Sequence, residues 1–185
     1  MHRKHFAIEL LVIVIAAYTL LWAQQDKSQR PSPPGTAECT IKGKKVTISY
    51  SRPSMKGRKI MGGLVPYGQV WRTGANEATT LVTETDLNIG GAQVPAGTYT
   101  LYTLPSEGTW KLIINKQTGQ WGTEYNQDQD LARVDMAKSS IAAPVEQFTI
   151  ALDQASNDKA DLVLEWEQTR LTVPITPGKV APVAK

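Results

Sequence analysis

Residues 148–175 read FTIALDQASNDKADLVLEWEQTRLTVPI, and the spacing of their apolar side chains indicates the fold of the chain. Apolar residues alternate with polar or small ones in three runs, 148–152, 162–166 and 171–175. Because successive side chains of a strand point to opposite faces of a sheet, each run predicts a half-buried β-strand. We expect a turn at each intervening polar cluster, 156–159 and 168–170, and therefore a meander of three strands.

Similar runs lie nearer the N-terminus, at 46–50, 79–84, 86–89, 98–104 and 110–115. Gly90-Gly91 is a tight-turn signal because both residues tolerate positive φ, and Pro95 to Gly97 predict a second turn. After the apolar N-terminus, no segment has the length, period and caps of a helix. The pattern predicts an all-β protein, an antiparallel β-sandwich or jelly-roll-like domain of about 8–10 short strands.

One segment interrupts this pattern. Residues 51–77, SRPSMKGRKIMGGLVPYGQVWRTGANE, have no steady period. Irregular loops of this length are uncommon in compact domains, and they are usually functional or disordered. The segment contains the apolar and aromatic residues that disordered segments lack, namely Ile60, Met61, Leu64, Val65, Tyr67, Val70 and Trp71. We therefore expect one long, ordered loop that builds a site.

The same segment carries an excess of positive charge. Residues 39–83 contain eight bases and one acid, a local net of +7, whereas residues 84–185 contain thirteen acids and eight bases, a net of −5. Such a division indicates a face that attracts anions. The alternative is that the two halves neutralise each other across one fold.

The N-terminus has the organisation of an export signal. Residues 2–5 are basic, residues 6–22 are apolar apart from one glutamate, and Ala23 suits the position before a cleavage site. We expect a periplasmic or secreted protein, with an uncleaved membrane anchor as the alternative because Leu21 is bulky for the −3 position. Composition predicts a signal peptide over 1–23, a flexible linker over 24–36, one folded domain over 37–175 and a flexible tail over 176–185.

Histidine and cysteine are scarce. Both histidines, His2 and His5, lie in the predicted signal, which excludes a Ser-His-Asp or Cys-His catalytic arrangement and a histidine-ligated metal site in the mature chain. The single cysteine, Cys39, has no disulfide partner within the chain, and we expect it to be a small buried residue of the first strand. Export and a net charge of only +3 disfavour nucleic-acid binding. We predict no metal and no cofactor.

The long loop supplies most of the candidate binding residues. Arginine forks match carboxylates and phosphates, and nearby glycines let backbone N–H groups approach the same anion. Trp71 and Trp121 stand in glycine-bearing irregular contexts, where a ring stacks on a sugar or flat ligand or else anchors the loop; Trp110 and Trp166 belong to strands and are expected in the core. The candidate ligand-binding residues are Arg52, Lys56, Arg58, Tyr67, Trp71, Arg72, Asn76, Glu77 and Trp121.

Glu77 is the lone carboxylate among these cations. It is the candidate for a catalytic acid or base, or for a residue that orients Arg72 through an ion pair. Glycoside chemistry would require a second carboxylate nearby, such as Glu124 or Asp128, and the sequence does not place either of them close to Glu77. Asp128 and Asp130 lack the glycine and the closing glutamate of a calcium loop and are expected in a solvated turn.

The chain contains an ordered set of short motifs: YSRP (50–53), MKGRKI (55–60), GLVPYG (63–68), VWRTGANEA (70–78), PAGTY (95–99) and WG (121–122). This set resembles the bacterial family called "domain of unknown function 2911". The resemblance covers about residues 40–175 and implies an exported bacterial protein with a mostly β domain. It implies no catalytic residues.

Together these features predict an exported envelope protein that serves as a binding module for an anionic or sugar-containing ligand. The alternatives are a histidine-independent hydrolase or lyase that uses Glu77, and a purely structural or assembly protein. Contact with a membrane is expected only through an uncleaved N-terminal segment.

Overall fold

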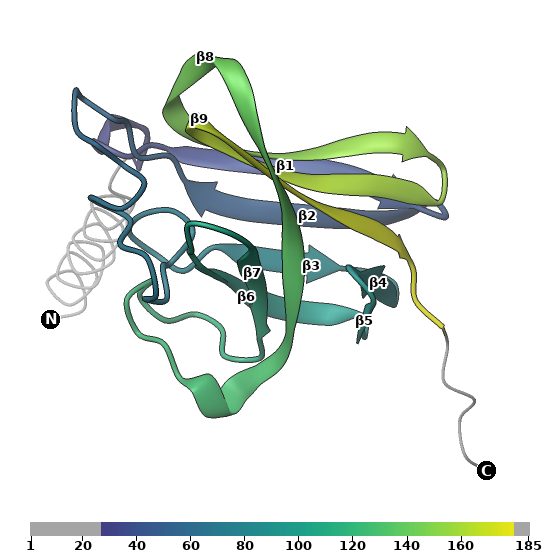
Figure 1. Ribbon diagram of the computed structural model, residues 1–185. Helices are drawn as coiled ribbons and strands as arrows, with labels where there is room; N and C mark the ends of the chain where they lie inside the picture. Colours follow the sequence, from purple (N-terminus) through teal and green to yellow (C-terminus); the bar gives the residue numbers. More distant parts are fainter. Residues whose placement is uncertain (1–26, 180–185) are drawn as a thin grey trace, which may run out of the picture. The chain divides into compact units, whose positions relative to one another are not determined.

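The structure is a computed structural model that describes residues 27–179 (Figure 1). The predicted signal peptide and the last residues of the predicted tail lie outside the described residues. A 3-10 turn, η1 (Lys27–Gln29), comes before the residues that form the β domain. Within the described part of the chain, no helix has the length and apolarity needed to cross a membrane.

Nine antiparallel strands form the domain, which confirms the all-β prediction. The elements are β1 (Pro34–Ile41), β2 (Lys44–Ser51), β3 (Thr80–Thr83), β4 (Leu87–Ile89), β5 (Ala92–Val94), β6 (Gly97–Leu104), β7 (Trp110–Asn115), the 3-10 turn η2 (Gln127–Gln129), β8 (Asp130–Ser156) and β9 (Lys159–Pro177). Neighbouring strands follow the order β1-β2-β3-β6-β7-β8-β9-β4-β5. β1 begins at Pro34, inside the segment that composition assigned to the linker.

β8 joins two parts of this sheet. Its first residues, 130–136, pair with β7, and residues 137–156 pair with β9. Figure 1 shows β8 as a long green ribbon that leaves β7 and crosses to the side of β9. Since β8 also packs against β1, the two parts of the sheet face each other in a sandwich-like arrangement.

Two features of this hairpin differ from the sequence prediction. The expected turn at 168–170 is wrong, because β9 continues through it and Ser139 and Ser140 pair with Arg170 and Thr169. The register of the β8–β9 pairing instead shifts on both sides of Val145. Its partner Glu167 has a φ of 53°, as expected for a residue at a β-bulge. The first half of β8 was not predicted as a strand at all. The expected turns at 156–159 and at Gly90-Gly91 are confirmed as tight hairpins.

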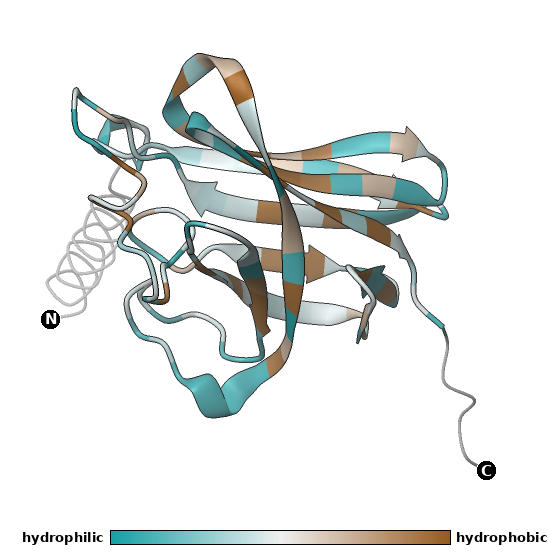
Figure 2. Ribbon diagram, viewed as in Figure 1, coloured by the Kyte–Doolittle hydropathy of each residue, from teal (hydrophilic) through white to brown (hydrophobic). Residues whose placement is uncertain are grey.

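The core lies between the two parts of the sheet. Figure 2 shows hydrophobic and hydrophilic residues alternating along the strands, as period two requires. Trp110 and Trp166 are at most 1% exposed, which confirms their predicted core role. Cys39 is likewise buried on β1, and burial raises the pKa of its thiol.

Candidate functional site

The long loop, residues 52–79 between β2 and β3, is held to the β8–β9 hairpin by carboxylates. Glu167 of β9 accepts hydrogen bonds from the backbone N–H groups of Ile60 at 2.9 Å and Met61 at 3.1 Å. Glu146 of β8 accepts one from the N–H of Lys56 at 2.9 Å. Hydrogen bonds to an ionised acceptor are stronger than neutral ones, so these bonds fix the course of the first half of the loop.

The basic side chains of the loop are not neutralised by acids. Within residues 27–179, none of them forms an ion pair with a carboxylate: Arg52, Lys56, Arg58, Lys59 and Arg72. Two of the arginines instead donate to uncharged oxygens. Arg52 donates to the Thr149 hydroxyl at 3.0 Å, and Arg58 donates to the carbonyls of Ser54 and Met55 at 2.7 and 2.9 Å. The positive charge that the sequence places in this segment therefore persists in the fold.

The second half of the loop is pinned to β6 and carries backbone strain. Trp71 exchanges backbone hydrogen bonds with Thr103, at 2.8 and 3.0 Å. Thr73 has a φ of 53°, a region that β-branched residues rarely adopt, and its carbonyl accepts a hydrogen bond from the Thr79 hydroxyl at 2.8 Å. Conformations of this kind cost about 1–3 kcal/mol and concentrate at functional sites and ligand clamps.

Asn76 connects the loop to the segment that follows β7. Its φ is 58°, and its side-chain amide donates to the Ser32 carbonyl and the Ser51 hydroxyl at 3.1 and 3.2 Å. Its carbonyl accepts a hydrogen bond from the N–H of Gly122 at 3.0 Å. A Cβ at position 122 would lie 2.9 Å from that carbonyl oxygen, so only glycine permits this close approach.

Where the two segments meet, they enclose a pocket of about 400 Å³. Its lining comes from the segment before β1, from the long loop, from the segment after β7, from β6 and from β9. The lining residues are Ser32, Pro53, Arg58, Leu64, Val70, Trp71, Arg72, Gly74, Ala75, Tyr102, Gly122, Thr123, Tyr125 and Trp166.

The pocket is positively charged. Two arginines, Arg58 and Arg72, line it, and its lining contains no aspartate or glutamate. The methylene groups of Arg72 pack close to Gly122, since a Cβ there would lie 3.0 Å from the Arg72 Cδ. The Arg72 side chain makes no hydrogen bond or ion pair with any residue that the structure describes. This guanidinium therefore keeps all of its donors for a ligand or for solvent.

Aromatic rings form much of the pocket wall. The Trp71 ring stacks on Trp166 with a centroid distance of 5.8 Å and an interplanar angle of 19°. Its edge-to-face contact with Phe148 has a centroid distance of 5.0 Å. Trp71 is thus a packed anchor of the loop and at the same time part of the pocket surface.

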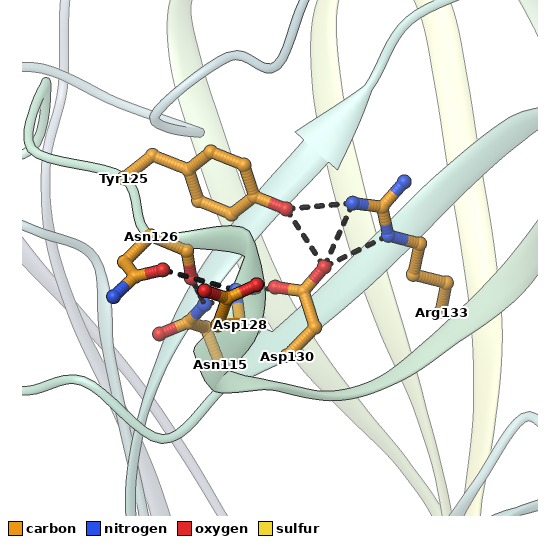
Figure 3. A network of polar contacts seen from close by, with 6 residues as sticks. All are labelled: Asn115, Tyr125, Asn126, Asp128, Asp130 and Arg133. Atoms are coloured by element: carbon orange, nitrogen blue, oxygen red, sulfur yellow. Dashed lines mark hydrogen bonds and ion pairs between the residues drawn. The ribbon is translucent and has the colours of Figure 1, made fainter.

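The two pocket tyrosines contribute rings rather than free hydroxyls. Tyr102 donates to the Glu124 carbonyl at 2.8 Å, and its ring lies edge-to-face with that of Tyr125. Tyr125 donates to Asp130 Oδ2 at 2.7 Å and accepts from an Arg133 Nη at 2.7 Å, as the triangle of contacts in Figure 3 shows. Burial, followed by the hydrogen bond to Asp130, raises the pKa of the Tyr125 phenol from 10.0 to about 12. Tyr125 is therefore neutral at physiological pH.

Asp130 is held on both oxygens. Besides Tyr125, it accepts from Arg133 Nε at 2.8 Å and, through Oδ1, from the buried amide of Asn115 at 2.8 Å. Asp128 lies nearby, but its backbone N–H donates to the side chain of Asn126, which caps the turn η2 (Figure 3). Among the described residues, no group of His, Cys, Asp and Glu side chains is arranged to hold a metal ion.

Three of the residues predicted for the site line the pocket: Arg58, Trp71 and Arg72. The other six lie elsewhere: Arg52, Lys56, Tyr67, Asn76, Glu77 and Trp121. Of these six, Tyr67 covers Gly62, and the exposed Trp121 forms a β-bridge with Glu77. No ion pair joins Arg72 to Glu77 in the described structure.

Sequence reasoning missed three aromatic residues of the pocket. Tyr102 and Trp166 occupy strands, where alternation indicates only a core position, and Tyr125 follows a turn-rich segment without a recognisable motif. The closeness of Tyr125 to the Trp121-Gly122 motif was the one signal that could have drawn attention to it.

Comparison with known proteins identifies the family. The family described as "Protein of unknown function (DUF2911)" matches residues 32–175, so the chain belongs to it. The match spans the β domain except for the last two residues of β9, and it includes the complete lining of the pocket. Neither the curated proteins nor the solved structures include one that matches.

Proposed function

We propose that this protein is a binding module whose pocket takes up a small anionic ligand, of which a sugar or another flat or apolar group forms part. The observation that carries the proposal is the Arg72 guanidinium, which lines a pocket without carboxylates and has no partner among the described residues. Hydrogen bonds to charged groups contribute about 1.5–3 kcal/mol each, so a single arginine contact of this kind is enough to fix the orientation of a ligand.

The second cation supports the same ligand class. Arg58 is held by two backbone carbonyls through Nε and one Nη, which leaves the N–H groups of its other Nη for an acceptor outside the loop. Because its side chain is already ordered, little rotamer entropy is lost when it binds an anion.

The aromatic wall supports an organic portion of the ligand. The partly exposed rings of Trp71 and Tyr125 and the exposed Leu64 offer an apolar surface beside the arginines. Pockets of about 300–1,000 Å³ that combine such surfaces with a few polar groups are typical of small-molecule sites. The hydrolase or lyase alternative gains no support from this pocket, since Glu77 does not line it.

Export is part of the proposal. The basic residues 2–5 and the apolar residues 6–22 support a signal that delivers the domain to the periplasm or to the medium. The ligand would then be a compound of the cell envelope or its surroundings.

The test compares two variants of the long loop that each lose one positive charge. Arg72→Gln removes the unpaired pocket guanidinium, whereas Lys59→Gln removes an exposed charge that does not line the pocket. The full chain is titrated with a panel of small organic anions, each with a sugar or aromatic group, and tryptophan fluorescence reports on the Trp71–Trp166 stack.

For any anion that binds, we expect Arg72→Gln to weaken affinity by about 10- to 100-fold, the equivalent of one charged hydrogen bond. Lys59→Gln should change it by less than about 2-fold. An equal effect of both variants would show nonspecific attraction by the loop, and a panel without any binder would overturn the proposed function.

A further inference from the structure

The pocket contains a second kind of donor besides its arginines. Gly74 and Ala75 line its wall within a segment of unusual backbone conformation, with φ of 53° at Thr73, 152° at Gly74 and 58° at Asn76, and without a positive φ at Ala75. Irregular turns of this kind can present successive backbone N–H groups to one anion.

The hydrogen bonds of this segment leave its N–H groups without acceptors. The carbonyl of Thr73 accepts from Thr79, and the carbonyl of Asn76 accepts from Gly122. The N–H groups of Gly74 and Ala75, in contrast, donate to no residue that the structure describes. Both residues are buried and both line the pocket. Backbone N–H groups are nearly always paired, so these two are available to an acceptor that enters the pocket.

We infer that Arg72, Arg58 and the N–H groups of Gly74 and Ala75 form a site for a tetrahedral oxyanion, a phosphate or sulfate ester. This inference rests on the proposed function and adds the chemical class of the ligand. The planar guanidinium of Arg72 takes two oxygens of the ester in a forked contact. A third oxygen, which a carboxylate lacks, is available to the backbone N–H groups. The organic part of the ester lies against the aromatic wall of the pocket.

The test compares three anions that carry the same ring: phenyl phosphate, phenyl sulfate and benzoate. Phenyl sulfate and benzoate carry the same single negative charge. The difference between their affinities therefore reports the effect of the shape of the anionic group. The full chain is labelled with ¹⁵N, and the backbone amide signals of Gly74 and Ala75 are followed during each titration. A direct amide signal is preferable to Gly74→Ala, because a side chain at a φ of 152° strains the backbone and interferes with folding.

We expect at least one of the two esters to bind about tenfold or more tightly than benzoate and to shift the Gly74 and Ala75 amide protons downfield. Arg72→Gln should abolish these shifts, whereas Lys59→Gln should retain them. Binding of only one ester would support the site and would identify the ligand as a phosphate ester or as a sulfate ester.

Two results would overturn the inference. If all three anions bind equally, depend on Arg72 and leave the two amide signals in place, the pocket binds anions as proposed but has no oxyanion site. If none of the three binds while other anions of the panel do, the site accepts a different class of ligand, and the proposed function again survives without it.

Discussion

Replacing Glu167 with alanine should loosen the long loop and, with it, the wall of the pocket. The Glu167 carboxylate accepts the N–H groups of Ile60 and Met61, and Ile60 is fully buried, so water cannot replace the lost acceptor there. A buried N–H left without a partner costs about 1–3 kcal/mol, and the more accessible bond to Met61 adds about 1 kcal/mol. Backbone strain at position 167 is unchanged, because alanine also carries a Cβ at the φ of 53°.

The expected total is a loss of about 2–4 kcal/mol in the free energy of unfolding. For a domain of this size it corresponds to a fall in melting temperature of roughly 5–15 °C. Thermal unfolding followed by circular dichroism measures it. The matched control is Asp161→Asn on the same strand, whose carboxylate makes no hydrogen bond or ion pair within residues 27–179. The reasoning fails if Glu167→Ala melts within about 2 °C of the wild type, or no lower than the control.

Three further predictions concern charge, pH and processing. Arg72→Gln should lower the melting temperature by no more than about 2–4 °C, because the guanidinium has no partner within the described structure; a larger loss would reveal a structural ion pair. The pKa of Tyr125 is higher in the folded protein than its ordinary value of 10.0, so its contribution to stability is complete below pH 10 and is lost as the pH rises toward about 12. Denaturant melts of the wild type and Tyr125→Phe should therefore converge over that interval, and a constant difference would contradict the role of Asp130. Mass spectrometry of the exported protein should show cleavage after Ala23, and reductant should leave its melting temperature unchanged because Cys39 has no disulfide; an intact N-terminus or a reductant-sensitive melt would be the opposite result.

The strands that the sequence predicted are those with buried side chains at a regular period. β2 buries mainly one face, and β6 and β7 are buried along most of their length on both faces. The first half of β8 was missed for the complementary reason. Residues 137–144 expose side chains on both faces, so no hydrophobic period marks them, and backbone pairing with β9 holds residues 137–140 in the strand. The polar composition of residues 168–170 predicted a turn. The prediction was wrong because pairing with β8 keeps Thr169 and Arg170 in the strand.

The pocket was predictable in part. Arg58, Trp71 and Arg72 belong to the one long segment without strand period, and that irregularity was visible in the sequence. Tyr102, Tyr125 and Trp166 reach the pocket from β6, from the segment after β7 and from β9. Their approach depends on long-range strand pairing, which local patterns do not encode.

The amino-acid sequence by itself determined that the protein is mainly β, that one loop interrupts its strands, and that this loop carries positive charge without histidine. These properties follow from periodicity and composition, which are local. Only the tertiary structure decided which of the charges stay unpaired. Glu146 and Glu167 bind backbone N–H groups of the loop rather than its basic side chains, and Arg72 consequently faces a pocket without a carboxylate. The physical reason is that a carboxylate chooses its partner over a few ångströms. Glu146 and Glu167 are about 90 or more positions away from the loop in sequence, and they come within that range only once β8 and β9 have packed beside the loop.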